Sequence, residues 1–125
     1  MLNDACVLVA EDEPFIALDL ALAIEDAGGQ VVGPAASVKE ALALLEATAV
    51  AGAILDVTLA DKDVTPIAEL LIASGIPLIL QTGVGLPPDM AARFPDLIVR
   101  IKPCDSAQLV DELAALIGDR AATIA

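Results

Sequence analysis

The 125-residue sequence contains no histidine, no tryptophan and no tyrosine. Without histidine, the chain cannot form a Ser-His-Asp triad, use an imidazole base, build a histidine metal site or carry phosphohistidine. Its two cysteines, Cys6 and Cys104, are too few for a disulfide framework and lack the spacing of a zinc site. We therefore expect two reduced thiols. The sequence also excludes catalysts that depend on histidine, histidine metal sites and a cysteine zinc site.

Basic residues are also scarce. Six lysines and arginines stand against nineteen aspartates and glutamates, which gives a formal net charge of −13. Nucleic acids and anionic membranes bind proteins through clustered lysine and arginine side chains. The charge balance therefore argues against both as partners.

The sequence shows no targeting or membrane segment. The first residues, MLNDAC, lack the basic start of a signal peptide. The longest stretch without charge, residues 70–88, is interrupted by glycine and proline, which excludes a continuous membrane helix. The chain is shorter than two typical domains, and its 58% of hydrophobic residues suffices for a core. We expect a soluble, cytoplasmic protein with one domain over residues 1–125.

The sequence is organised as an alternation of short apolar runs and helix-length segments. Apolar runs bounded by acidic residues, glycine or proline predict buried strands at residues 6–10, 30–33, 51–55, 77–81 and 97–101. Capping and stop signals predict helices over residues 13–27, 37–48, 65–75 and 105–118, with a short helix near residues 88–94. This alternation predicts an α/β fold: a flavodoxin-like, (βα)5 doubly wound parallel sheet with strand order 2-1-3-4-5.

Polar side chains follow four of the predicted strands. Glu11 and Asp12 follow the first strand, Asp56 the third, Thr82 the fourth and Lys102 the fifth. In a sheet of this order, ligands bind at the carboxyl ends of the strands, so these groups are expected at one edge. Crowded carboxylates invite a cation, and Mg²⁺ is the best fit because it prefers oxygen ligands.

Each of these residues taken alone also has a structural explanation. Glu11 and Asp12 could be acidic residues that favour a helix N-terminus. Asp56 and Thr82 could be turn residues, and Lys102 a solvated charge. The combination of all five at the ends of four strands favours a site.

Four short motifs carry a family resemblance: VLVAEDE, AILDVTL, LILQTG and IKPC. In this order and spacing, the chain resembles a response-regulator receiver domain of bacterial two-component signalling over essentially its full length. The segments LQTGVG and DVTLADKDVTP also resemble the single-domain receivers called the FAT GUY group.

The resemblance implies a role for each strand-end residue. Asp56 would be the phosphoacceptor, and Mg²⁺ would be held by Glu11, Asp12, Asp56 and the backbone carbonyl of Thr58. The same resemblance assigns Thr82 and Lys102 to the oxygens of the phosphoryl group. Positioning and charge neutralisation around a carboxylate nucleophile are what phosphoryl transfer requires.

The sequence departs from the receiver pattern at three places. Val99 stands where the family usually has an aromatic residue, Cys104 replaces a frequent phenylalanine, and the usual Met-Pro after the phosphoacceptor loop is missing. These positions concern output more than phosphate chemistry. We therefore expect an intact phosphorylation site and an unusual switch.

The helix predicted to follow the first strand begins with an apolar segment that includes Phe15 and Leu18. Large apolar residues are usually buried in the core, which is one interpretation of Phe15. In receivers, exposed apolar residues at this position dock a kinase or phosphotransfer protein. By position alone, Phe15 or Leu18 could contribute to such a surface.

The sequence thus predicts a stand-alone receiver that is phosphorylated on Asp56 by a histidine kinase or histidine phosphotransfer protein. It would signal to a downstream protein partner and would not be an enzyme beyond its own phosphotransfer and dephosphorylation. One alternative is a pseudo-receiver that binds a partner without a phosphate cycle. Another is a phosphatase similar to haloacid dehalogenases, although Thr58 stands where that pattern needs an acid.

Overall fold

The computed structural model describes residues 2–124, with side chains described as far as residue 119. Residues 1 and 125, the two ends of the predicted domain, lie outside the described residues. The strands are β1 Cys6–Ala10, β2 Gln30–Ala35, β3 Gly52–Asp56, β4 Leu78–Thr82 and β5 Ile98–Ile101. The helices are α1 Pro14–Asp26, α2 Val38–Ala47, α3 Thr65–Ala73, α4 Pro88–Arg93 and α5 Ser106–Ile124.

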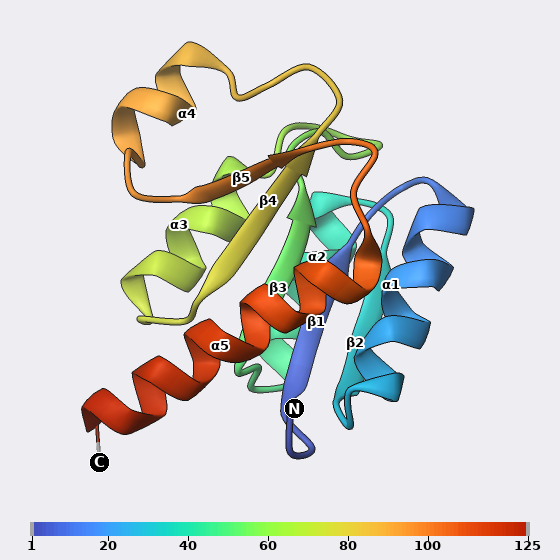
Figure 1. Ribbon diagram of the computed structural model, residues 1–125. Coiled ribbons are helices and arrows are strands. Elements are labelled where there is room, and N and C mark those ends of the chain that lie inside the picture. Colours follow the sequence, from blue (N-terminus) through green and yellow to red (C-terminus); the bar gives the residue numbers. More distant parts are fainter. Residues whose placement is uncertain (1, 125) are drawn as a thin grey trace.

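The five strands form a parallel sheet with the order β2-β1-β3-β4-β5, which confirms the predicted topology (Figure 1). Each strand except the last leads through a helix to the next strand, so all strands end at the same edge of the sheet. The site described below lies at this carboxyl edge.

Helices cover both faces of the sheet, α1 and α5 on one and α2 and α3 on the other (Figure 1). Successive side chains in a strand point to opposite faces, and the strands divide their apolar residues accordingly. In β1, Val7 packs with the α1 and α5 side and Leu8 with the α2 and α3 side. Among residues 2–124, none of the helices combines the length and the apolar character that crossing a bilayer requires.

Several predicted boundaries were wrong. Strand β2 does not stop at Gly33 but continues to Ala35, because an edge strand tolerates a proline that cannot donate a ladder hydrogen bond. Gly33 has a φ of +103°, and a Cβ there would lie 2.9 Å from the Val9 carbonyl oxygen. Helix α5 continues through Gly118, since a single glycine lowers helix stability without ending the helix.

The loop between β3 and α3 is tied to the start of α2 by Asp61. The Asp61 carboxylate accepts hydrogen bonds from the backbone N–H of Val38 at 2.8 Å and of Lys39 at 3.2 Å. The first of these bonds is the main cause that lowers the pKa of Asp61. In the same loop, Asp63 accepts a hydrogen bond from the N–H of Thr65, the first residue of α3.

Candidate functional site

The strand-end residues identified in the sequence lie together at the carboxyl edge of the sheet. Asp56 is the last residue of β3 and Thr82 the last residue of β4. Glu11 and Asp12 follow β1 directly, and Lys102 follows β5. β3 lies between β1 and β4 in the sheet, so parallel pairing brings these ends together.

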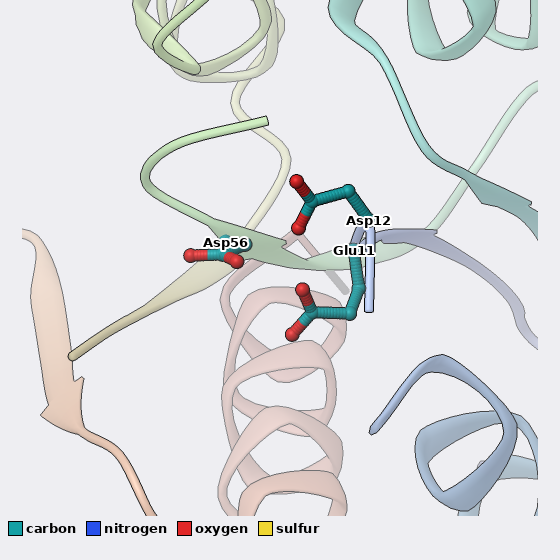
Figure 2. Close-up of side chains that lie close together, drawn as sticks. All are labelled: Glu11, Asp12 and Asp56. Carbon is teal, nitrogen blue, oxygen red and sulfur yellow. The ribbon is translucent and has the colours of Figure 1, made fainter. Parts of the chain in front are cut away.

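Three carboxylates form a cluster at this edge. Glu11, Asp12 and Asp56 each contribute one oxygen, and these oxygens lie within 4.8 Å of one another (Figure 2). Glu11 and Asp56 are buried, whereas Asp12 is exposed. An oxygen-only donor set that is open on one side fits a hard divalent cation, because Mg²⁺ keeps part of its water shell. The arrangement therefore suits Mg²⁺ better than zinc or copper.

The Lys102 ammonium bridges two of the three carboxylates. Its Nζ donates to Glu11 Oε1 and to Asp56 Oδ2, each at 2.9 Å. The Lys102 side chain is 19% exposed, while those of Glu11 and Asp56 are 0% and 11% exposed. Buried carboxylates need a paired charge, and Lys102 supplies it.

Burial and neighbouring charges shift the acidities of this group. The pKa of Glu11 is raised to about 7: desolvation is the main cause, the neighbouring Asp56 adds to it, and the hydrogen bond from Lys102 acts in the opposite direction. For Lys102, desolvation lowers the pKa, but the hydrogen bonds to Glu11 and Asp56 outweigh it and the net shift is upward. Glu11 thus lies near the balance between its neutral and charged forms at neutral pH.

The raised pKa of Glu11 predicts a pH dependence of stability in the metal-free protein. Folded Glu11 keeps its proton up to about pH 7, whereas the unfolded chain releases it near the ordinary value of 4.5. Folding therefore binds a proton in this window, and stability falls as pH rises through it. We expect the melting temperature of the wild type to drop relative to that of Glu11→Gln between about pH 5.5 and about pH 8, in the presence of a chelator. Parallel curves for the two proteins would contradict the shift.

The Thr82 hydroxyl is part of the turn that follows β4. Thr82 Oγ1 donates to the Gly85 carbonyl oxygen at 3.0 Å and accepts the N–H of Val84 at 3.3 Å. The side chain is buried beside the strand that carries Asp56. The structure therefore shows the Thr82 hydroxyl engaged in its own turn, which agrees with its structural explanation as a turn residue.

Thr58 lies two residues beyond Asp56 in the loop that Asp61 ties down. It is exposed and forms an isolated antiparallel bridge with Asp63. The flanking residues Val57 and Leu59 are buried in the core. The loop is thereby anchored on both sides of the Thr58 backbone carbonyl.

Gln81 is a member of this site that sequence reasoning missed. It precedes Thr82 in β4, is 2% exposed, and donates from Nε2 to Glu11 Oε1 at 3.2 Å. Glu11 Oε1 therefore accepts from both Lys102 and Gln81, and Glu11 Oε2 accepts the N–H of Glu13 at 3.3 Å. The available signal was the amide that interrupts the apolar run LILQT at its end.

Phe15 and Leu18 lie on α1 near the same edge. Phe15 is 82% exposed and Leu18 56% exposed, so Phe15 is not a core residue. Phe15 borders a groove of about 490 Å³ that is also lined by Gln81 and Lys102. The apolar start of α1 is thus open beside Gln81 and Lys102 of the site.

Comparison with solved structures identifies the family. SdrG from Sphingomonas melonis Fr1 is 34% identical, with 94% of this chain and 98% of that chain covered and a TM-score of 0.75. A response regulator receiver protein from Sinorhizobium medicae WSM419 is 27% identical, with 96% and 99% covered and a TM-score of 0.80. The chain belongs to the response-regulator receiver family. Neither a scan of protein-family models nor a search of the curated proteins finds a match to this receiver.

The receiver also resembles part of a longer regulator. The response regulator PhyR from Brucella abortus is 28% identical with a TM-score of 0.75, and the match covers 96% of this chain. It covers 51% of PhyR, so the receiver spans about half the length of that chain.

Two departures from the receiver pattern are visible in the structure. Val99 is partly buried and packs against the core cluster on the α2 and α3 side of the sheet. The Cys104 thiol donates to the Ile101 carbonyl oxygen at 3.2 Å, and burial raises its pKa. At these two positions, this receiver therefore has an aliphatic residue and a neutral thiol where the family usually has aromatic rings.

Proposed function

We propose that this receiver accepts a phosphoryl group on Asp56 from a histidine kinase or histidine phosphotransfer protein in a Mg²⁺-dependent reaction. The observation that carries the proposal is the position of the Lys102 ammonium, 2.9 Å from Asp56 Oδ2, within the three-carboxylate cluster. In many proteins, a lysine paired with a buried carboxylate has only a structural role. Here two further carboxylates, those of Glu11 and Asp12, lie beside the pair, and together with Asp56 they can bind a cation.

The proposed reaction transfers the group between two nucleophiles. A carboxylate oxygen of Asp56 attacks the phosphorus, the P–N bond to the donor histidine breaks, and the imidazole takes up a proton as it leaves. Lys102 and the Thr82 hydroxyl would contact the phosphoryl oxygens, where negative charge concentrates. Mg²⁺ held by Glu11, Asp12, Asp56 and the Thr58 carbonyl would neutralise part of that charge.

Incubation with acetyl phosphate and Mg²⁺, followed by intact-mass measurement, tests the proposal. Acetyl phosphate is a small donor that needs no partner protein, so the result depends on this chain alone. We expect the mass of one phosphoryl group on the folded wild type and none when a chelator replaces Mg²⁺. A folded protein that binds Mg²⁺ but gains no mass would favour the pseudo-receiver alternative.

We propose that output occurs through protein contacts and that the protein is not an enzyme acting on an external substrate. The net charge of −13 supports this choice, because it opposes binding to nucleic acids and anionic membranes. The proposed reaction would take place in the cytoplasm. Membership of the receiver family supports this proposal over the phosphatase alternative.

The exposed start of α1 is the proposed docking surface for the phosphoryl donor. Phe15→Ala removes a ring that is 82% exposed, so we expect unchanged stability and slower phosphotransfer from the cognate kinase or phosphotransfer protein. Phosphorylation by acetyl phosphate should not change, since that donor needs no docking. Equal phosphotransfer rates for Phe15→Ala and the wild type, followed by intact mass, would exclude Phe15 from the docking surface.

The aspartyl phosphate is expected to hydrolyse slowly. Val84 lies two residues beyond Thr82, is 96% exposed and has no polar group to orient an attacking water. We expect Val84→Glu to shorten the lifetime of the phosphorylated protein several-fold, because a carboxylate can accept a hydrogen bond from that water. Loss of the added mass with time after removal of acetyl phosphate gives both rates. An unchanged or longer lifetime in Val84→Glu would contradict this role.

A further inference from the structure

Gln81 occupies a position where an apolar side chain would be the ordinary choice. It lies in β4 after three buried residues, and its Cα pairs with that of Asp56 on β3. Burying an amide is unfavourable unless its polar atoms are hydrogen-bonded. Gln81 meets this requirement by donating to Glu11 Oε1 at 3.2 Å. The contact joins the interior of the sheet to the carboxylate cluster.

Gln81 and Lys102 donate to the same oxygen of Glu11, but they differ in how firmly they are placed. Lys102 follows β5 at the edge of the sheet, and its charged group sits on a long flexible stem with 19% of the side chain exposed. Gln81 is a neutral donor on a central strand and is 2% exposed. A packed amide fixes the direction of the Glu11 carboxylate, whereas an ammonium mainly balances its charge.

We propose that Gln81 is a positioning residue that holds Glu11 in the orientation needed to bind a divalent cation together with Asp12 and Asp56. This inference rests on the proposed function, since it assigns a supporting residue to the proposed Mg²⁺ site. Groups that hydrogen-bond to metal ligands fix the ligand orientation, and their loss weakens metal affinity or activity by about 10–100-fold.

Gln81→Met tests the role, because methionine has a similar length and shape but no N–H donor. Gln30→Met is the matched control. Gln30 is exposed and is the first residue of β2, so it lies at the amino ends of the strands and away from the site at their carboxyl ends. Titration calorimetry with Mg²⁺ is expected to give a dissociation constant about tenfold higher for Gln81→Met and an unchanged one for Gln30→Met.

Phosphorylation by acetyl phosphate at increasing Mg²⁺ gives a second readout. For Gln81→Met, the Mg²⁺ concentration for half-maximal rate should rise by the same factor, while the rate at saturating Mg²⁺ stays within about twofold of the wild type. A purely space-filling role would leave the half-saturation unchanged. If Gln81→Met does not fold, Gln81→Leu replaces it: this variant also lacks the donor and is apolar like the residues that precede it in β4, so it should weaken Mg²⁺ binding in the same way.

The outcomes separate this inference from the proposed function. A folded Gln81→Met or Gln81→Leu with wild-type Mg²⁺ affinity would overturn the role of Gln81 while phosphorylation of the wild type stands. A wild type that binds Mg²⁺ but gains no phosphoryl mass would contradict the proposed function, and the calorimetric comparison would still decide the role of Gln81. No Mg²⁺ binding by the folded wild type would overturn both.

Discussion

The Asp56→Asn variant is expected to take up no phosphoryl group from acetyl phosphate under conditions in which the wild type does. The substitution keeps the size of the side chain but replaces the carboxylate nucleophile by an amide. An amide nitrogen is a poor nucleophile because its lone pair is delocalised into the carbonyl group. In the wild type, a carboxylate oxygen attacks phosphorus, the bond to the acetate oxygen breaks and acetate leaves. This step has no counterpart in Asp56→Asn.

The measurement is intact mass after incubation with acetyl phosphate and Mg²⁺. Asp96→Asn is a matched control, since Asp96 is an exposed aspartate in the segment before β5 and should leave uptake unchanged. Melting temperatures of both variants establish that they fold. The added mass on the wild type should also disappear with hydroxylamine, which cleaves acyl phosphates.

Uptake of a phosphoryl group by folded Asp56→Asn would mean that a residue other than Asp56 is the phosphoacceptor. The nearby carboxylates Glu11 and Asp12 would then be the first candidates, because they lie in the same cluster. Loss of uptake in Asp96→Asn as well would show that the assay responds to general damage. The pair of variants therefore tests the position of the acceptor and not merely its existence.

Lys102→Met is expected to destabilise the metal-free protein strongly and to make its stability depend on Mg²⁺. The substitution removes the ammonium that hydrogen-bonds Glu11 and Asp56, and it leaves two buried carboxylates close together. Charged hydrogen bonds contribute about 1.5–3 kcal/mol each, and loss of one partner of a buried pair costs more. Since Lys102 retains some exposure, we expect a loss of about 2–3 kcal/mol in the free energy of unfolding.

Thermal unfolding at about pH 8 with a chelator measures this loss, because Glu11 of the wild type is mostly ionised there and pairs with Lys102 as a carboxylate. The melting temperature should fall by roughly 10 °C for a domain of this size. Lys39→Met is the control: Lys39 is exposed on α2, and its replacement should change stability by less than about 0.5 kcal/mol.

Addition of Mg²⁺ is expected to raise the melting temperature of Lys102→Met more than that of the wild type. The cation then becomes the principal positive charge at the cluster, and binding to the folded state alone stabilises it. Equal stabilisation of both proteins by Mg²⁺ would contradict this interpretation. A metal-free Lys102→Met as stable as Lys39→Met would show that the two carboxylates do not depend on the lysine.

The sheet order and the meeting of Asp56 with Glu11 were predictable because they follow from local patterns. Each strand is an apolar run of limited length, and its last residue marks the carboxyl edge. The parallel order then places β1 beside β3 without any knowledge of side-chain contacts. Lys102 was predictable in the same way, as the first charge after β5.

Contacts between distant segments were not predictable from such patterns. The hydrogen bond from Gln81 to Glu11 joins residues 70 positions apart, and nothing local distinguishes Gln81 from a strand-end polar residue. The buried face of α1 was also hard to assign, because its sequence is apolar on almost every side. Leu20 is buried together with Ala17 and Ile24, Ile16 and Ala23 are only partly buried, and Leu18 is left exposed.

The attachment of the loop after Asp56 to α2 has a consequence for dynamics. The amide hydrogens of Val38 and Lys39 are bonded to the Asp61 carboxylate and not to a carbonyl of their own helix. They can exchange with solvent only when the loop lifts from the end of α2 or that helix end itself opens. Asp61→Ala removes the acceptor of both bonds, so exchange at Val38 and Lys39 is expected to become faster in that variant. The hydrogen-exchange rates of the Val38 and Lys39 amides in α2 therefore report movements of the segment that follows Asp56.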